Sequence, residues 1–396
     1  MTAVAPGRAP PSRARVVVLV GALQILSWGS TFYLPAVLAG PISRDAGWPI
    51  AAVVGGLSWS LLVSAAVAPR VGAAIDRLGG RPVLATGSVL LAAGLAALGL
   101  AESLAVYYLA WTVLGLGMSA GLYDAAFSTI GRLYGGEARP SITGVTLLGG
   151  LASTVAWPIM AALEARFGWR DTCFVMAAAQ LFLALPAYWL LLPRPPAEAP
   201  AGPPAREGAG PLVDPAARRR ALIVLATALT LYSFAVSGMA VHVLEGLRQL
   251  GLEPAAAVAI GMAIGPAQVG GRILEFAFGR RLHPAWTARV GISLVLAGLV
   301  LLAGAPPWFA VGAAAVYGAG NGIMTIARGT LPLALFGPKG YGATIGLTAR
   351  FSLLASATAP VALALVLERG GPLALFGAAA ALVALAALGF CLLRPR

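Results

Sequence analysis

Long uncharged apolar runs dominate the chain. They cover residues 16–40, 48–69, 82–101, 141–163, 172–192, 221–244 and 373–393. Five further runs are as apolar but include one or two charged residues: 105–130, 255–279, 287–305, 308–335 and 342–367. A helix needs about 20 mostly apolar residues to cross the hydrocarbon core of a bilayer. The pattern therefore predicts an all-α membrane protein with twelve transmembrane helices.

The composition of the 396-residue chain supports this interpretation. Apolar residues make up 59% and charged residues 10%, whereas soluble globular chains have roughly 45–50% and about 25%. An ordinary soluble enzyme and a disordered chain are both excluded. The two cysteines, Cys173 and Cys391, form no metal-binding motif. No GxxxxGK[ST] motif occurs, so we expect no cofactor. The energy source is then an ion gradient, suspected to be of protons, or the substrate's own gradient.

The basic residues follow membrane topology. With the N-terminus inside, 19 of the 27 Lys and Arg residues lie in segments on that side and five in outside loops. Positive residues concentrate in cytoplasmic segments, so both termini are predicted to be cytoplasmic. The run 16–40 exceeds the 7–15 apolar residues of a signal peptide and is expected to be retained. The net charge of +13 thus indicates topology and contact with the lipid bilayer rather than nucleic acid.

The chain divides into two halves. Residues 193–220 are rich in Pro, Gly and Ala and end in three arginines, which is typical of a linker. The predicted domains are a six-helix bundle over 1–192, a cytoplasmic linker over 193–220 and a second six-helix bundle over 221–396. The 26 Arg against one Lys favour a GC-rich bacterium, and hence the plasma (inner) membrane. We expect a monomer whose partner is a small-molecule substrate.

A motif recurs in the two halves. Gly72-x3-Asp76-Arg77-x-Gly79-Gly80-Arg81 follows the second run, and Gly271-x3-Glu275-x3-Gly279-Arg280 ends the eighth. An offset of 199 residues aligns Gly72 with Gly271, Asp76 with Glu275, Gly80 with Gly279 and Arg81 with Arg280. Two six-helix halves related by an internal repeat are the plan of alternating-access transporters.

The stretch GAAIDRLGGRP resembles the signature of the loop between helices 2 and 3 in the major facilitator superfamily, and it stands in the same place. The resemblance covers the whole chain and implies two pseudo-symmetric six-helix bundles (the major facilitator fold). It also implies a cytoplasmic gate formed by Gly72, Asp76, Arg77, Gly80 and Arg81. An acid near a helix N-terminus and arginines that bridge helix ends give this role a physical basis.

Two departures argue against a typical drug exporter. Many members of the superfamily have Arg in helix 4, four residues before a GxG. Here Trp111 precedes Gly115-Leu116-Gly117. Drug/proton antiporters have a Gly-Pro pair in helix 5, and residues 149–158 contain none.

Apart from Arg289 near the start of the run 287–305, five charged residues lie inside the predicted helices: Asp124, Arg272, Glu275, Arg328 and Arg350. A charge at mid-bilayer costs about 2.5–3.5 kcal/mol on insertion scales, so such residues are functional candidates by default. Arg272 pairs with Glu275 or with the substrate, and Arg350 with Asp124 or with the substrate. A carboxyl group buried in a membrane favours its neutral, protonated form. Asp124 and Glu275 are therefore candidate proton-coupling residues, or else permanently ionised partners of the arginines.

Polar residues at helical spacing indicate a cavity between the helices. Gln268, Arg272 and Glu275 share one face, as do Tyr317, Asn321 and Arg328. Similar stripes are Gln24, Ser27, Trp28 and Thr31 in the first run, and Tyr232 and Ser233 in the seventh. Singly, such residues often only hold membrane helices together. Stripes on several helices together favour a polar cavity at the midplane, where transporters bind their substrates.

Some features resemble the monocarboxylate and oxalate–formate branch of the superfamily. Trp28-Gly29 precedes the loop Arg44-Asp45-Ala46-Gly47-Trp48, Tyr123 follows a GxG, and helices 8 and 11 each have a central cation. This likeness implies that Arg272 and Arg350 clamp a carboxylate, with Tyr33 and Tyr123 as hydrogen-bond partners. Gln268, Asn321 and Arg328 complete the expected substrate site. Asp124 departs from that branch's usual neutral residue.

The leading interpretation is a secondary active transporter, proton-coupled and moving a small organic anion. Two alternatives stay open. Residues 123–127, Tyr-Asp-Ala-Ala-Phe, also look like bacterial efflux members, which favours export of drugs, metabolites or metalloid species. A non-transporting membrane sensor built on the same fold is the other alternative. The predicted loops include no soluble signalling domain, which weighs against a sensor.

Overall fold

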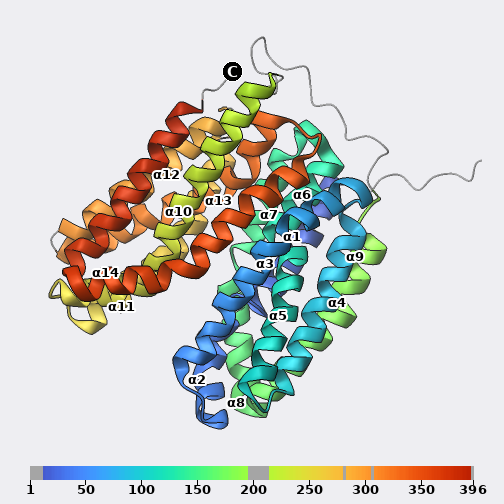
Figure 1. Ribbon diagram of the computed structural model, residues 1–396, viewed down its shortest axis with the longest axis horizontal. Helices are drawn as coiled ribbons and strands as arrows, with labels where there is room; N and C mark the ends of the chain where they lie inside the picture. Colours follow the sequence, from blue (N-terminus) through green and yellow to red (C-terminus); the bar gives the residue numbers. More distant parts are fainter. Residues whose placement is uncertain (1–11, 195–213, 280–281, 305–306, 394–396) are drawn as a thin grey trace, which may run out of the picture.

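The computed structural model describes residues 12–194, 214–279, 282–304 and 307–393. Most of the predicted linker and the arginines 8, 206, 280, 281, 394 and 396 lie outside these residues. The described residues are helical and contain no strand. Figure 1 shows two bundles that lean against each other, the N half in blue to green and the C half in yellow to red. The fold class is therefore the one that the sequence predicts.

Nine α-helices form the N half. They are α1 (Arg13–Gly29), α2 (Leu34–Ala46), α3 (Ile50–Leu78), α4 (Gly80–Gly99), α5 (Leu104–Gly121), α6 (Tyr123–Tyr134), α7 (Arg139–Gly149), α8 (Ala152–Ala179) and α9 (Leu185–Leu191). A 3-10 turn, Gly135–Glu137, follows α6, and a π-helical turn, Gln180–Ala184, joins α8 to α9.

Among the described residues, five α-helices form the C half. They are α10 (Pro215–Gln249), α11 (Pro254–Phe278), α12 (Pro284–Gly304), α13 (Ala310–Phe336) and α14 (Tyr341–Leu392). A 3-10 turn, Pro307–Phe309, precedes α13.

Nine helical segments of the described residues are long and apolar enough to span a membrane. This count is lower than the twelve separate spans that the sequence predicts. Two of the nine, Arg139–Leu191 and Tyr341–Leu392, have 53 and 52 residues, or roughly 80 Å at 1.5 Å per residue. That exceeds twice the core thickness of about 30 Å. Gly168 and Gly371, with φ of +80° and +73°, divide them, and α11 lies outside the nine.

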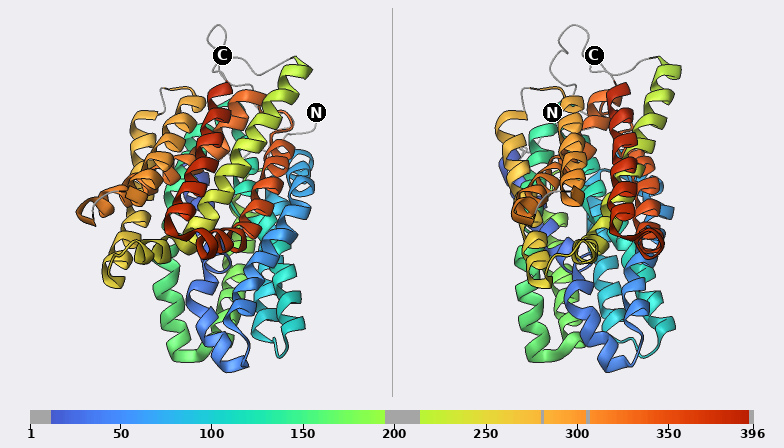
Figure 2. Two further views of the ribbon diagram at one scale, coloured as in Figure 1. Left: turned by 60° about the vertical axis from the view of Figure 1, so that its left-hand side comes forward. Right: turned by 90° about the vertical axis from the view of Figure 1, so that its left-hand side faces the viewer.

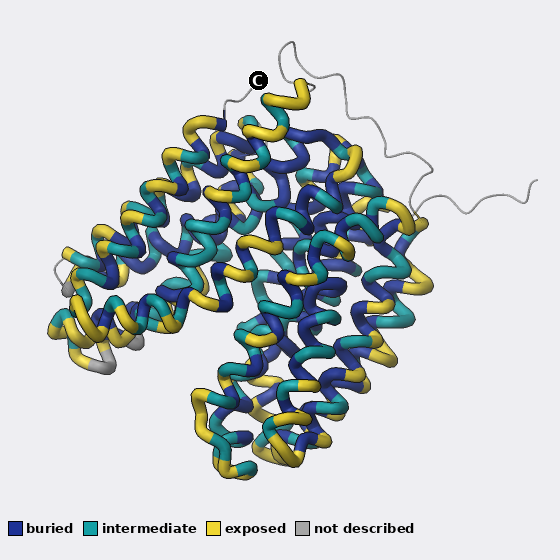
Figure 3. Tube along the Cα trace, viewed as in Figure 1, coloured by how far each residue is buried: buried dark blue, intermediate teal, exposed yellow. Residues whose placement is uncertain are grey.

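The outer faces of both halves are apolar. Figure 3 shows exposed residues along the outward sides of the helices and buried residues where helices meet. Large apolar side chains are among the exposed ones, including Leu109, Phe182, Val361 and Leu388. Such faces would drive aggregation in water but match lipid, as expected for a chain that crosses the bilayer many times.

Three of the expected spans are broken near their middle. α1 and α2 are separated by residues 30–33, α5 and α6 by Leu122, and α7 and α8 by residues 150–151. At the first break, the hydroxyls of Ser30 and Thr31 donate to the carbonyl oxygens of Leu26 and Ser27. Leu122 is extended, with φ −90° and ψ −169°. Irregular backbone at membrane depth is tolerated where it is buried or faces a cavity.

The two halves meet at the end of the molecule where α1 begins and α14 ends, which we call the closed end (Figure 2). There the Asp76 carboxylate at the end of α3 accepts hydrogen bonds from the backbone amides of Gly342 and Ala343, both at 2.8 Å. These are amides of the first turn of α14, which have no partner within the helix. The negative charge also suits the positive end of the helix dipole.

A second contact across the closed end joins α7 to α11. Arg139, the first residue of α7, forms an ion pair with Glu275 at 2.8 Å. Its guanidinium also donates to the Gly279 carbonyl at 2.7 Å, the Thr287 hydroxyl at 3.0 Å and the Leu282 carbonyl. The expected alternative of an Arg272–Glu275 pair is therefore wrong. Arg139 pairs with Glu275 and also satisfies carbonyls that the end of α11 leaves without helical partners.

Close backbone approach makes the Asp76 contact tight. A Cβ atom at Gly72 would lie 2.0 Å from the Gly342 carbonyl oxygen. Apolar packing adds to it, since Leu333, Tyr341 and Ile345 of the C half belong to a buried cluster that otherwise comes from the N half. The closed end is thus a packed interface with hydrogen-bonded charges inside it.

We expect Gly72→Ala to weaken this interface by about 1–3 kcal/mol, the usual cost of overpacking. The variant should melt at a lower temperature in detergent and expose the closed end to thiol reagents at introduced cysteines. Gly265→Ala in α11 is the control, because nothing lies within 4 Å of its Cβ position. Equal melting temperatures and equal labelling of the two variants would contradict the tight approach.

Candidate functional site

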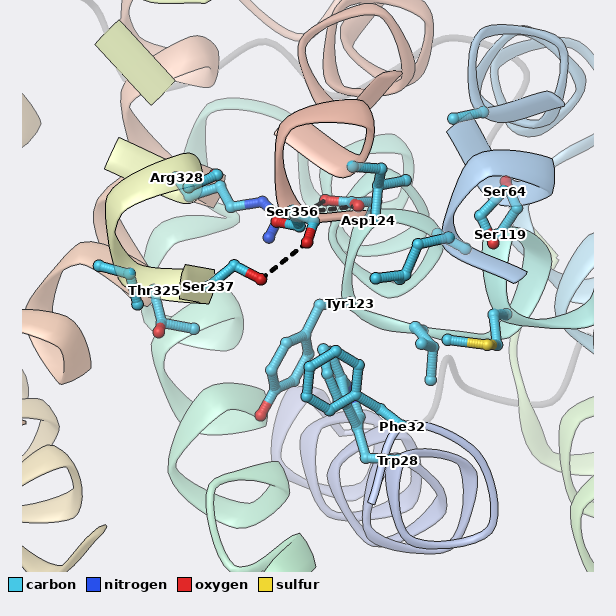
Figure 4. A pocket seen from close by; sticks show the side chains of 18 of the residues that line it. Trp28, Phe32, Ser64, Ser119, Tyr123, Asp124, Ser237, Thr325, Arg328 and Ser356 are labelled. Atoms are coloured by element: carbon cyan, nitrogen blue, oxygen red, sulfur yellow. Dashed lines mark hydrogen bonds and ion pairs between the residues drawn. The ribbon is translucent and has the colours of Figure 1, made fainter. Parts of the chain in front are cut away.

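A cavity of about 580 Å³ lies between the halves and reaches the helix breaks. It is lined by α1, α3, α5 and α6 and the α1–α2 break from the N half, and by α10, α11, α13 and α14 from the C half. Figure 4 shows its labelled side chains, which come from both halves and point toward one space. Both halves therefore contribute to one site, as a rocking transporter requires.

Aromatic rings form one wall of the cavity. The Trp28 ring lies 4.9 Å from that of Tyr123, 5.3 Å from Phe32 and 6.0 Å from Tyr33, centre to centre. Tyr123 in turn stacks on Phe127 at 5.2 Å. The helix breaks explain the cluster, because residues 30–33 and Leu122 turn these side chains toward the same space. We call Trp28, Phe32, Tyr33 and Tyr123 the aromatic wall.

An ion pair crosses the cavity from one half to the other. Both oxygens of Asp124, in the first turn of α6, lie 2.5 Å from the Nη2 of Arg328 on α13 (Figure 4). Asp124 and Arg328 are the only charged side chains among the described residues that line the cavity. The sequence left the partner of Asp124 open between Arg328 and Arg350, and the structure selects Arg328.

The C half contributes neutral polar groups. The Tyr232 hydroxyl donates to Oδ1 of Asn321 at 2.9 Å. The Ser237 hydroxyl donates to the Ser356 carbonyl at 2.9 Å (Figure 4). Gln268 lines the cavity on α11, whereas Asn321 is buried behind Tyr232. The two hydrogen bonds hold α10 against α13 and α14. The Gln268 side chain takes part in neither and lies at the cavity surface.

Arg272 lies one turn beyond Gln268 and is only 6% exposed. Its guanidinium donates to the Thr146 carbonyl at 3.1 Å and approaches the Thr325 hydroxyl at 3.4 Å. No acidic side chain of the described residues forms an ion pair with it. Arg272 is thus a buried cation bonded only to neutral groups. It lies behind the cavity lining, which it reaches through Thr325.

Two buried polar atoms in this region have no hydrogen-bond partner. They are the Nε of Arg272 and the hydroxyl of Tyr123. Both lie against the break between α7 and α8. A Cβ atom at Gly149 would be 2.5 Å from the Tyr123 hydroxyl, and one at Gly150 would be 1.8 Å from an Arg272 nitrogen. Buried donors without acceptors are costly, so these two groups favour an acceptor such as a carboxylate, and both are closed off from the cavity in this structure.

The other predicted site residues lie elsewhere. Arg350 is exposed on α14 and does not line the cavity. Glu275 is buried at the closed end with Arg139. Of the predicted gate residues, Gly72 and Asp76 contact the C half, and Gly72 also reaches the cavity lining.

The remaining gate residues belong to the N half. A Cβ atom at Gly80 would lie 1.9 Å from Thr129, so Gly80 packs closely against α6. The Arg81 guanidinium lies 5.4 Å from the centre of the Trp189 ring on α9. Arg77 is exposed at the end of α3.

One face of the cavity, on α3, was not predicted from the sequence. α3 contributes Leu57, Ser58, Leu61, Ser64 and Ala68. These residues recur every three or four positions within the run 48–69, with small and polar side chains among them. That spacing marks one face of a helix and was the available signal. Phe32, in the break after α1, carried no such periodic signal.

Comparison with known proteins bears on the family. The model of the Major Facilitator Superfamily matches residues 19–288, more than half of the chain. No curated protein matches the sequence. Among solved structures, that of the human organic anion transporter MFSD10 (TETRAN) superposes with a TM-score of 0.74 at 20% identity, over 96% of this chain and 100% of that one.

Two transporter structures of other kinds are also similar. The major facilitator superfamily transporter FucP in the outward conformation has a TM-score of 0.71 at 13% identity, over 95% of this chain and 98% of that one. The proton:xylose symporter XylE bound to 6-bromo-6-deoxy-D-glucose has 0.71 at 12%, over 95% and 94%. At such identities the structural likeness shows only the fold. The family match shows that the chain is a transporter that belongs to the major facilitator superfamily.

Proposed function

We propose that the protein is a secondary active transporter that moves a small organic anion together with protons by alternating access. The observation that carries the proposal is Arg272, a buried residue that bonds to Thr325 of the cavity lining and that no acidic group of the described residues neutralises. A buried charge is costly unless it is paired. An anionic cargo supplies the missing charge, and the planar guanidinium fork suits a carboxylate.

The proton has a suitable site in Asp124. Its ion pair with Arg328 joins α6 of the N half to α13 of the C half. Protonation of Asp124 removes one charge of this pair, loosens the contact between the halves and frees Arg328. A proton thereby becomes linked both to the rocking of the halves and to the charge that the cargo meets.

The direction of the cavity follows from the closed end. We assign this end to the cytoplasm, because α1 begins and α14 ends there and the basic residues Arg77, Arg81 and Arg139 stand at helix ends on this side. The cavity then faces outward, and the Asp76 and Glu275 contacts are the cytoplasmic gate. Opening the other way requires breaking both contacts. We further propose a plasma membrane as the location, with both termini in the cytoplasm.

Arg272→Ala should lower the affinity for an anionic cargo about 100-fold, since a buried charge pair contributes roughly 2–5 kcal/mol. The measurement is uptake of labelled carboxylates into proteoliposomes, with binding followed by thermal shift. Arg70→Ala, at an exposed position of α3, is the control. Unchanged uptake by Arg272→Ala would refute the anion site.

Arg350→Ala tests the second arm of the expected clamp. Because Arg350 is exposed and does not line the cavity, we expect uptake within about twofold of wild type, as for surface substitutions that contribute less than 0.5 kcal/mol. A loss as large as that of Arg272→Ala would restore the two-arginine clamp.

Asp124→Asn should uncouple transport from the pH gradient. The amide binds no proton in this range, so accumulation driven by an acid exterior should disappear while exchange of cargo across the membrane continues. Uptake and counterflow in proteoliposomes with imposed pH gradients measure the two. Asp171→Asn, at an exposed position of α8, is the control. Retained gradient-driven accumulation in Asp124→Asn would make this carboxylate a structural partner of Arg328 only.

Asp76→Asn and Glu275→Gln should behave alike, because each acid holds the closed end shut without touching the cavity-bound cargo. We expect slower transport with an unchanged dissociation constant for both. Initial uptake rates and thermal-shift titrations measure these quantities separately. Lost binding in Glu275→Gln alone would instead assign Glu275 to the proton or substrate site.

A further inference from the structure

We propose that the cargo is a monocarboxylate with an aromatic body, bound with its carboxylate at Arg272 and its ring against the aromatic wall. This inference rests on the proposed function and adds the size, the apolar character and the charge of the anion. It departs from the smallest members of the class, such as formate or oxalate, which consist of carboxylate groups with almost no body.

The cavity is large for a bare carboxylate. Its volume of about 580 Å³ falls within the range of about 300–1,000 Å³ that is usual for drug-sized ligands. A two-carbon anion bound at Arg272 would leave most of this volume in contact with apolar side chains. A cargo that fills the space must therefore have a body of considerable size.

The lining is suited to an aromatic ring. Trp28, Phe32 and Tyr33 present ring faces and edges to the cavity, and Leu57, Leu61 and Met118 line it as well. Aromatic pairs with centres 4.5–7 Å apart contribute about 0.5–1.5 kcal/mol beyond their area burial. Tyr123 belongs to the wall, and its unpaired hydroxyl packs against Gly149, next to the Gly150 that the Arg272 guanidinium contacts. The apolar and the anionic parts of the site therefore adjoin each other.

The charges of the site favour a single carboxylate. Asp124 and Arg328 neutralise each other at 2.5 Å, so among the described residues Arg272 is the one cation beside the cavity that no acid compensates. While Asp124 is ionised and paired with Arg328, a second carboxylate on the cargo would find no free cation and would be repelled by Asp124. Because like charges in a low-dielectric site repel strongly, a dianion is disfavoured.

Four probes test these features in thermal-shift titrations of the purified full-length protein in detergent at pH 7.5. They are 3-phenylpropionate, its amide 3-phenylpropionamide, the ring-free propionate and the dianion phenylsuccinate. We expect 3-phenylpropionate to bind most tightly and propionate to bind about 10- to 100-fold more weakly, since the ring no longer buries apolar surface. The amide and the dianion should each bind at least about tenfold more weakly, because a charge is missing or unpaired.

The outcomes separate this inference from the proposed function. Propionate as strong as 3-phenylpropionate would overturn the aromatic body and leave the anion site intact. A tighter phenylsuccinate would overturn the single charge. An amide as strong as the acid, or no binding by any carboxylate, would overturn the anion transporter itself and this inference with it.

Variants of the wall provide the matched test. Trp28→Leu and, in a second protein, Phe32→Leu should weaken 3-phenylpropionate about tenfold and leave propionate unchanged, while Trp28→Phe restores most of the affinity. Trp308→Leu, which changes an 82% exposed tryptophan, is the control and should alter neither. Equal loss of both ligands in both wall variants would overturn the contact of the ring with this wall.

Discussion

An ionised side chain inside a membrane must find a partner, and the structure depends on how each charge meets this constraint. Asp124 pairs with Arg328, and Glu275 pairs with Arg139. Each pair joins one half of the molecule to the other, so the charges that solvation requires to be paired also hold the halves together. Arg272 is buried and bonds only to neutral groups, which is why the cargo is assigned to it.

The internal repeat places equivalent contacts at the closed end in both halves. Asp76 and Glu275 lie 199 residues apart at equivalent places of the two halves. Asp76 binds the first amides of the helix that begins at Tyr341, and Glu275 binds the first residue of the helix that begins at Arg139. Each acid thus secures the start of a helix in the opposite half. Two equivalent contacts that break together give the molecule two discrete arrangements, as alternating access requires.

Much of the fold could be predicted from the sequence, because apolar runs, basic loops and a spaced repeat are local properties of the chain. The stripes with Trp28, Tyr232 and Arg328 likewise predicted side chains of the cavity. The partner of Glu275 could not be predicted, since Arg139 begins α7 just before the predicted run 141–163, and which helix it meets depends on tertiary packing. Periodicity also places Arg350 on a face of its helix without telling which neighbour that face meets, so its exposure emerged only from the structure.

The most direct test of the central claim is a structure of the protein with a bromine-labelled cargo, 3-(4-bromophenyl)propionate, located by the anomalous signal of the bromine. We predict the carboxylate within hydrogen-bond distance of the Arg272 guanidinium and the Tyr123 hydroxyl, with the bromine among the residues that line the cavity. A carboxylate bound elsewhere, with the Arg272 guanidinium still bonded only to Thr146 and Thr325, would contradict the account.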